Sequence, residues 1–417
     1  MARTTSSSSS KKRTSGRRKG AGRGPVAGKA AAAARAGSVN GAVTPAVARA
    51  RGAAAPPVDL AQVRARIDSV DEQIHALLNE RAKLAQLVGI SKTLDGRTVD
   101  FYRPEREAQV LRMAKARNKG PLRNEEILRL FREIMSACLA QQEPLKVAFL
   151  GPEGTFTQTA VYAHFGHSVR ALALPSTDEV FHEVESGTAD FGIVPIENST
   201  EGVVNNTLDR FLNSPLKICG EVELRIHHSL MGNVPSLDRI VRICAHPQAL
   251  AQCRAWLDDH LPDVERVPVA SNAEGARRAR DEKGTAAIAG ETAAEIYNLQ
   301  VLAAEIEDRP DNTTRFFVLG RKLFAPSGED RTTLLVSVAH TDSSGALFRL
   351  LEPLSRYKVN MTRIESRPSH KRKWDYVFFI DIDGHAEDAP VAKALEALKK
   401  RASLFRVLGS YPRAVTA

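Results

Sequence analysis

The chain has 417 residues, which exceeds the usual size of one domain and predicts two to four folded units. Its net charge is +10, but residues 1–57 alone hold twelve Lys or Arg and no Asp or Glu, so the rest carries roughly −2. The positive net charge therefore does not indicate that residues 58–417 form a specific nucleic-acid-binding protein. No apolar run reaches the roughly 18 residues of a membrane helix. The four cysteines lack C-x-x-C spacing, so we expect a reduced cytosolic chain without a metal site.

Residues 1–57 are biased toward Ser, Ala, Gly and basic residues. Such a segment cannot bury enough apolar surface to offset its chain entropy, so we predict a disordered tail. Three roles fit this composition. The tail could be a solubilising extension, a segment weakly attracted to nucleic acid or acidic surfaces, or an organellar transit peptide.

Residues 58–143 are predicted to be helical. The first helix carries apolar residues at alternating spacings of three and four, namely Leu60, Val63, Ile67, Val70, Ile74, Leu77, Leu84 and Val88. Arg81 and Lys92 fall on the same face of this helix. Further helices are predicted from about Pro104 and around residues 127–142, with Glu107 and Gln142 on their apolar stripes.

Each of these polar residues alone fits a buried salt bridge or a frayed helix end. Four together favour another explanation, because burying ionised groups costs several kcal/mol each unless partners are supplied. An anionic ligand inside a helical bundle would supply them. Arg64 lies on a different face, from which it could reach the pocket of a second copy, so we expect a homodimer or a higher homo-oligomer.

This segment resembles the all-helical chorismate mutase family, mainly through the run Tyr102-Arg103-Pro104-Glu105-Arg106-Glu107. The resemblance implies conversion of chorismate to prephenate without a cofactor or metal. It implies contacts to the substrate carboxylates from Arg64 of a partner chain, Arg81 and Arg106. It further implies that Lys92 and Gln142 bind the ether oxygen and that Glu107 binds the substrate hydroxyl.

Residues 145–321 repeat a pattern of buried strand, polar loop and helix. It occurs at Lys146–Leu150 before Gly151–Gln158, at 189–196 before Glu197–Gly202, at 240–244 before His246, and at 286–290. This alternation predicts parallel sheets, in two lobes around a cleft. The hydroxyls of Ser199 and Thr200 could cap the following helix. The loops lack the G-x-G-x-x-G pattern, so we expect no dinucleotide cofactor.

This unit resembles prephenate dehydratase through four motifs, G-P-E-G-T-F, V-P-I-E-N-S-T-E-G, H-P-Q-A-L-A-Q-C and N-T-T-R-F. The resemblance implies that Thr314 lies closest to the chemistry, although a strand-edge threonine remains the alternative. It implies six further substrate-binding candidates, Glu197, Asn198, His246, Gln252, Asn272 and Arg315. His246 fits a structural hydrogen-bonding role equally well.

The apolar pattern of residues 331–412 predicts strands and helices in the order βαββαβ, which is the ferredoxin-like plan. The segment has no cluster of acids or nucleophiles of its own, so it is interpreted as a binding module. It resembles the amino-acid-sensing ACT domain through Gly345-Ala346-Leu347 and Glu365-Ser366-Arg367-Pro368. The resemblance implies that these two segments bind phenylalanine at a dimer interface.

The predicted fold is therefore multidomain: a disordered tail (1–57), an all-α domain (58–143), a two-lobed α/β domain (145–321) and an α+β ferredoxin-like domain (331–412). The predicted function is a bifunctional cytoplasmic enzyme that makes prephenate from chorismate and phenylpyruvate from prephenate, with feedback inhibition by phenylalanine. Its partners would be these small molecules and further copies of itself. Two alternatives stay open, an arogenate dehydratase and a non-catalytic ligand-sensing regulator whose basic tail contacts nucleic acid.

Overall fold

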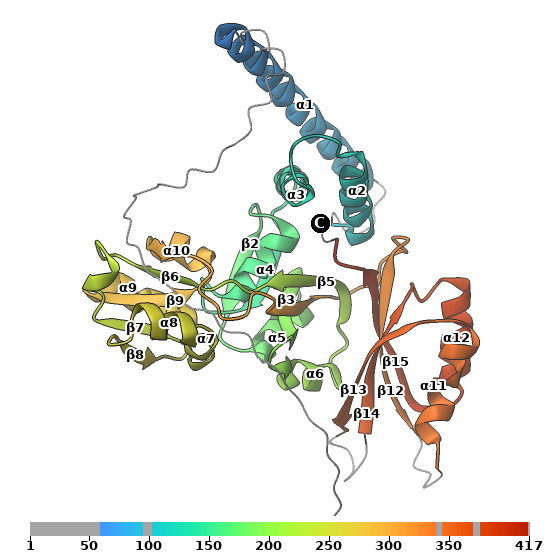
Figure 1. Cartoon of the computed structure of the whole chain (residues 1–417). Coiled ribbons are helices and arrows are strands. Elements are labelled where there is room, and N and C mark those ends of the chain that lie inside the picture. The colour runs from blue at the N-terminus through green and yellow to red at the C-terminus, as the bar shows by residue number, and fades with distance from the viewer. Residues whose placement is uncertain (1–58, 95–101, 339–343, 370–375, 416–417) are drawn as a thin grey trace, which may run out of the picture. The chain divides into compact units, whose positions relative to one another are not determined.

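The computed structural model describes residues 59–94, 102–338, 344–369 and 376–415 (Figure 1). The predicted disordered segment 1–57 lies outside these residues. The chain divides into two units, Met1–Val63 and Arg64–Ala417, and the sites below all belong to the second. Within the described ranges no helix is long and apolar enough to cross a membrane. The same residues contain no cluster of His, Cys, Asp or Glu that could hold a metal ion.

Three helices form the first part of the fold, α1 (Leu60–Leu94), α2 (Pro104–Arg117) and α3 (Asn124–Ala140). The predicted long first helix and the start of the second at Pro104 are confirmed. Pro104 fits there because the first turn of a helix needs no backbone N–H donor. At the start of α3 the Glu126 carboxylate accepts a 3.1 Å hydrogen bond from the backbone N–H of Arg123. Helix α2 packs on α3 and buries Ala108 and Leu111.

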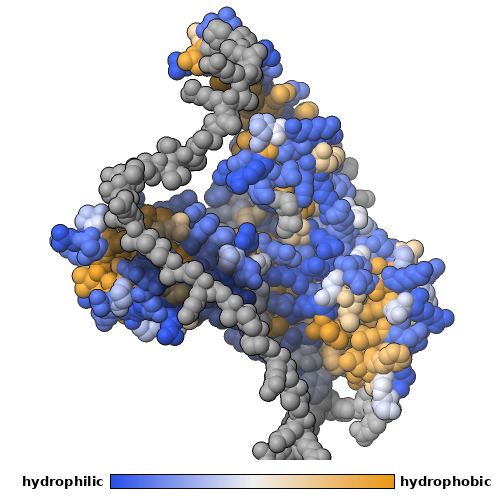
Figure 2. Space-filling model, viewed as in Figure 1, coloured by the Kyte–Doolittle hydropathy of each residue, from blue (hydrophilic) through white to orange (hydrophobic). Residues whose placement is uncertain are grey.

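The apolar stripe of α1 is exposed in the single chain. Ile67 is 53% exposed, Leu77 63% and Leu84 56%. Apolar residues are visible along this helix where the surface view shows it (Figure 2). Large apolar surfaces of this kind mark interaction sites in soluble proteins. The stripe pattern correctly predicted the helix but not what covers it.

The first lobe of the α/β domain is a mixed sheet in the order β2-β1-β3-β11-β5, with the short β4 paired to β3. Its strands are β1 (Lys146–Leu150), β2 (Arg170–Leu174), β3 (Phe191–Asn198), β4 (Gly202–Val203), β5 (Lys217–Arg225) and β11 (Thr313–Gly320). Its helices are α4 (Phe156–Phe165), α5 (Thr177–Ser186) and α6 (Asn205–Phe211). The prediction of parallel sheets holds for β1 with β2 and β3. It was wrong for β11, which returns from the second lobe and enters antiparallel between β3 and β5.

The second lobe is also mixed, in the order β10-β6-β9-β7-β8. Its strands are β6 (Ser229–Gly232), β7 (Arg242–Ala245), β8 (Glu265–Pro268), β9 (Thr285–Ala289) and β10 (Gln300–Ala303). Its helices are α7 (Pro247–Gln252), α8 (Arg254–His260), α9 (Asn272–Asp281), α10 (Glu291–Tyr297) and the 3-10 turn η1 (Leu237–Arg239). Strand β9 is buried along its whole length. Gly275 allows α9 to approach the carbonyl of Cys244 on β7 more closely than any side chain would permit.

The last part of the chain has the predicted βαββαβ order, which the structure confirms. Its elements are β12 (Asp330–Val338), α11 (Ala346–Arg356), β13 (Met361–Pro368), β14 (Tyr376–Asp383), α12 (Ala389–Lys399) and β15 (Ala402–Pro412). The sheet order is β13-β14-β12-β15, and α11 and α12 cover one face (Figure 1). The other face shares a core with the first lobe, where Phe379 and Tyr411 join Phe317.

Strand β15 meets strand β5 of the first lobe at Gly409, where an added Cβ would overlap the backbone carbonyl of Ile218. We expect Gly409→Ala to lower the free energy of unfolding by about 1–3 kcal/mol, because a well-packed contact between two backbones cannot absorb a methyl group. Chemical denaturation of the full chain measures this. Gly120→Ala is the matched control, since the nearest atom to its Cβ is 4.0 Å away. Equal stability of the two variants would contradict the packing argument.

Candidate active sites

A cavity of about 290 Å³ lies between the two lobes of the α/β domain. Strand ends and loops of both lobes line it, as expected for ligand sites of α/β proteins. The lining includes four of the predicted residues, Asn198, Gln252, Asn272 and Thr314. Phe156, Ile226 and Ala249 contribute an apolar part. The cavity therefore combines an apolar wall with a small set of amides and one hydroxyl.

The Asn198 side chain fixes the orientation of the Thr314 hydroxyl. Its Oδ1 accepts hydrogen bonds from the backbone N–H groups of Thr200 and Glu201, at 3.0 and 3.1 Å. Its Nδ2 must then be the donor to Thr314 Oγ1, at 2.8 Å. Thr314 consequently accepts from Asn198, and no described residue accepts the Thr314 proton. That proton is available to a ligand in the cavity.

The same hydrogen-bond chain continues to His228. Asn198 Nδ2 also donates to Asn312 Oδ1 at 2.8 Å, so Asn312 Nδ2 donates to Gln252 Oε1 at 3.3 Å. Gln252 Oε1 lies 2.8 Å from His228 Nε2, which therefore carries the proton. Gln252 Nε2 and His228 Nδ1 are buried and have no hydrogen-bond partner among the described residues. Buried polar atoms usually have partners, so these two favour a polar ligand.

His228 was not found from the sequence. Burial lowers its pKa, although the hydrogen bond to Gln252 and the charge of Glu307 oppose this shift. Its backbone N–H donates to Glu307 Oε2 at 2.8 Å, and Glu307 also contacts His227 at 2.7 Å. The only available signal was two adjacent histidines directly after a strand pattern, which is too weak to indicate a site.

Other predicted residues lie outside the lining of this cavity. His246 is the N-cap of α7, where its Nδ1 accepts from the backbone of Gln248 at 3.3 Å. Its own backbone N–H donates to Asn272 Oδ1 at 2.9 Å. Glu197 contacts Arg363 at 2.9 Å, and Arg315 contacts Asp381 at 2.6 Å. All three residues are therefore engaged with other parts of the protein.

The expected helix capping by Ser199 and Thr200 was wrong. Helix α6 begins at Asn205, and its N-cap Val204 makes no side-chain cap. Ser199 Oγ instead accepts from the backbone of Thr313 at 3.0 Å, and Thr200 Oγ1 donates to Asn312 Oδ1 at 3.3 Å. The two hydroxyls tie the loop to the start of β11, beside Thr314.

Within a single chain, the predicted mutase residues that the structure describes do not all lie in one site. Arg81 and Gln142 join α1 to α3, since Arg81 donates to the carbonyl of Ile134 at 3.5 Å and Gln142 to that of Ala85 at 2.8 Å. Arg64 and Arg106 are exposed. Lys92 belongs to α1, but its side chain lies outside what the structure describes.

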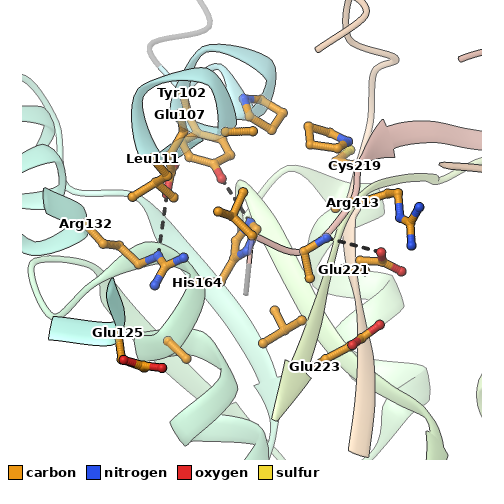
Figure 3. A pocket seen from close by; sticks show the side chains of 18 of the residues that line it. Tyr102, Glu107, Leu111, Glu125, Arg132, His164, Cys219, Glu221, Glu223 and Arg413 are labelled. Atoms are coloured by element: carbon orange, nitrogen blue, oxygen red, sulfur yellow. Dashed lines mark hydrogen bonds and ion pairs between the residues drawn. The ribbon is translucent and has the colours of Figure 1, made fainter. Parts of the chain in front are cut away.

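Glu107 faces a separate cavity of about 360 Å³ between α2, α3, α4, β5 and the residues after β15 (Figure 3). Burial raises the pKa of Glu107 to about 7, although Arg132, 3.9 Å away, and Tyr102 oppose the shift. The Tyr102 hydroxyl is 3.0 Å from His164 Nε2. Burial lowers the pKa of His164 to about 3, and the charge of Arg132 acts in the same direction. Around neutral pH this imidazole is uncharged.

The segments expected to bind phenylalanine occupy the start of α11 and strand β13. Gly345 is the N-cap of α11 with φ 78°, a left-handed conformation that favours glycine, and Ala346 and Leu347 begin the helix. Glu365, Ser366 and Pro368 lie on β13. Arg367, also on β13, binds both carboxylate oxygens of Asp209 in α6 at 2.9 Å.

The fold and the cleft define a multidomain α/β enzyme in which a helical bundle precedes the catalytic lobes and a small-molecule-binding module follows them. Comparisons with known proteins give three family matches along the chain. Residues 63–143 match chorismate mutase type II, residues 147–323 match prephenate dehydratase and residues 332–400 match the ACT domain.

A bifunctional chorismate mutase/prephenate dehydratase from Stutzerimonas stutzeri is 54% identical over 360 residues, which is 85% of this chain and 98% of the relative. The chain belongs to the family of bifunctional chorismate mutase/prephenate dehydratases.

Two solved structures resemble about two thirds of the chain. Prephenate dehydratase from Arthrobacter aurescens, crystallised in complex with L-Phe, is 38% identical with a TM-score of 0.60 and covers 66% of this chain and 93% of its own. GqqA, described as a novel type of quorum quenching acylase, is 31% identical with a TM-score of 0.60 and covers 64% and 98%. Because similar folds carry different activities here, the activity must be argued from the site.

The buried Glu107 predicts a pH dependence of stability. Between pH 4.5 and about 7 its carboxyl stays protonated in the folded chain but ionises in the unfolded chain. The folded state then binds more protons, so the free energy of unfolding falls as the pH rises through this range, by on the order of 3 kcal/mol. We expect Glu107→Gln to remove this contribution in denaturant titrations between pH 4 and 8.

The matched control is Glu125→Gln, which changes an exposed carboxylate at the rim of the same cavity. It should retain the pH dependence of the unmodified chain. A constant stability difference between Glu107→Gln and the unmodified chain at every pH would show that the pKa of Glu107 is the same in the folded and unfolded chain.

Proposed function

We infer that the protein rearranges chorismate to prephenate in its helical domain and converts prephenate to phenylpyruvate in the cleft of the α/β domain. The observation that carries this function is the Thr314 hydroxyl, which Asn198 turns so that its proton is free to be donated into the cavity. The family of the chain supports both activities.

In the dehydratase reaction the bond to the ring carboxylate breaks and its electron pair enters the ring, which expels the ring hydroxyl and becomes aromatic. With the uptake of one proton by the departing hydroxide, the products are phenylpyruvate, carbon dioxide and water. A donor aimed at the leaving oxygen lowers the barrier where water is excluded, because charge develops there in the transition state. Thr314 supplies this hydrogen bond, and the free amide of Gln252 and the Nδ1 of His228 orient the other polar groups of the substrate.

In the mutase reaction a C–O bond breaks and a C–C bond forms within one molecule. The protein must hold the reactive conformer and stabilise the charge that grows on the ether oxygen. We assign the carboxylates of the substrate to Arg81, Arg106 and Arg64 of a partner chain. Lys92 and Gln142 act at the ether oxygen and Glu107 at the hydroxyl.

A second copy of the chain completes the mutase site in this proposal. The exposed apolar stripe of α1 needs a covering surface, and the same stripe on another copy provides one of equal length and apolar character. Arg64 lies on this helix and is exposed, so it can enter the site of the other copy. The mutase then requires a dimer.

The ACT domain accounts for feedback by phenylalanine. The related dehydratase from Arthrobacter aurescens was crystallised with L-Phe, and we assign the ligand here to the start of α11 and to β13. Inhibition follows if phenylalanine binds one arrangement of the protein better than another. We place the enzyme in the cytoplasm, as its reduced cysteines and bacterial relatives suggest.

A coupled assay tests both activities. The full chain is given chorismate, and prephenate and phenylpyruvate are followed separately, with and without phenylalanine. Thr314→Ala should accumulate prephenate and form phenylpyruvate at least about 100-fold more slowly, the usual loss for one such donor. Thr313→Ala, on the neighbouring residue outside the cavity lining, should leave both rates unchanged.

Failure of the unmodified chain to consume prephenate would refute the dehydratase assignment. Faster turnover of arogenate than of prephenate would instead make the enzyme an arogenate dehydratase.

Mixing two inactive variants tests the shared mutase site. Arg64→Ala and Lys92→Ala should each be inactive as mutases. After denaturation and refolding together, about a quarter of the unmodified activity should return, because half of the dimers are mixed and each mixed dimer contains one intact site. Recovery of no activity, with dimers present by light scattering, would show that each chain builds its own site.

A further inference from the structure

Two residues next to the catalytic pair point away from the cleft. Glu197 on β3 and Arg315 on β11 face each other across the strand pair, one position from Asn198 and Thr314. Successive residues of a strand point to opposite faces of the sheet. Asn198 and Thr314 line the cleft, whereas Glu197 and Arg315 contact the ACT domain.

Arg315 is held in a buried cluster of charges. Its guanidinium contacts Asp381 of β14 at 2.6 Å, Glu221 of β5 at 2.7 Å and the Tyr411 hydroxyl at 3.2 Å. The side chains of Asp381 and Glu221 are 0% and 1% exposed. Removing one partner of such a pair strongly destabilises the folded protein, because the other charge stays buried. The cluster therefore anchors β11, the strand on which Thr314 lies, to the ACT domain.

Glu197 is held by a more adaptable contact. Arg363 Nε of β13 forms an ion pair with Glu197 Oε2 at 2.9 Å, and the two side chains are 11% and 37% exposed. The other two guanidinium nitrogens of Arg363 are buried and have no hydrogen-bond partner among the described residues. Unsatisfied buried donors cost free energy, so a movement that brought acceptors to them would be favourable.

Strand β13 connects this contact to the segment assigned to phenylalanine. Arg363, Glu365 and Arg367 alternate along β13 as its less exposed residues, while Ile364, Ser366 and Pro368 are exposed. Arg363 and Arg367 both reach the first lobe, at Glu197 and at Asp209. A ligand that shifts β13 therefore moves Arg363 relative to Glu197.

We propose that Arg363 and Asp381 of the ACT domain are positioning residues of the dehydratase. They hold Glu197 and Arg315, and through these neighbours they set the separation of Asn198 and Thr314 in the cleft. Arg363 is the adjustable member of this arrangement, through which phenylalanine bound at β13 changes the cleft. The inference rests on the proposed dehydratase function and its feedback by phenylalanine.

The test uses the partly exposed pair, because variants of the buried cluster can fail to fold. Arg363→Ala, Glu197→Gln and their double variant are assayed as full chains for prephenate turnover, with phenylalanine binding measured by calorimetry. The mutase rate of the same chain reports correct folding. Arg401→Ala is the matched control, since it removes an arginine whose partners, Glu352 and the carbonyl of Arg349, both lie in the ACT domain.

We expect kcat for prephenate to fall at least about tenfold in both single variants, with KM changed less than about twofold, because substrate contacts remain while the donor is displaced. The double variant should be no slower than either single one. Phenylalanine should still bind within about threefold of its normal affinity yet inhibit less, and Arg363→Lys should restore part of both properties.

Three results would overturn the inference while the unmodified chain still turns over prephenate. One is a normal kcat with full inhibition in Arg363→Ala. Another is loss of inhibition only because phenylalanine no longer binds, which would make Arg363 a ligand contact. The third is independent effects of the two single variants. An unmodified chain without dehydratase activity would refute the proposed function itself.

Discussion

The antiparallel pairing of β3 with β11 is the constraint on which the dehydratase cleft depends. The chain leaves the first lobe after β5, builds the whole second lobe and returns as β11 between β3 and β5. This return brings Thr314 opposite Asn198, although 115 residues separate them in the sequence. It also places the ligand loops of both lobes around one cavity. A shift of one residue in register would turn Thr314 away from the cavity.

The buried charges around Arg315 protect this register. A shifted β11 would leave Asp381 buried without its cation and Glu221 with Arg331 as its remaining cation. An unpaired buried charge costs several kcal/mol. The cluster therefore contributes specificity more than net stability. The same charges connect the catalytic strand to β14, so the arrangement that fixes the register also makes the cleft sensitive to the ACT domain.

The sequence predicted the features that depend on local pattern. It did not predict the features that depend on contacts between segments distant in the sequence. The stripe of α1, the Pro104 start of α2 and the βαββαβ order were readable because each follows from spacing within a few turns. The direction of β11 could not be predicted, because a single buried strand has the same sequence pattern in parallel and antiparallel sheets. His228 was missed because only the tertiary fold brings it to Gln252. Glu197 and Arg315 were predicted to bind substrate because they belong to sequence motifs. In the fold, each of them pairs with a charged residue of the ACT domain.

The two proposed activities differ in how much of their site one chain provides. The dehydratase cleft has its hydroxyl, amides and apolar wall within a single chain. Its hydrogen bonds run from the backbone through Asn198 and Asn312 to Gln252, which also accepts from His228. The helical domain instead exposes its longest apolar stripe. Of the predicted mutase residues whose side chains the structure describes, Arg81 and Gln142 form hydrogen bonds that link α1 to α3 or to the residues just after it. An apolar surface of this extent is costly in water. In the proposed dimer, association of two copies would stabilise the helices and complete the site in the same step. Under the proposed function, chain association therefore controls the mutase reaction directly, whereas the ACT domain controls the dehydratase reaction.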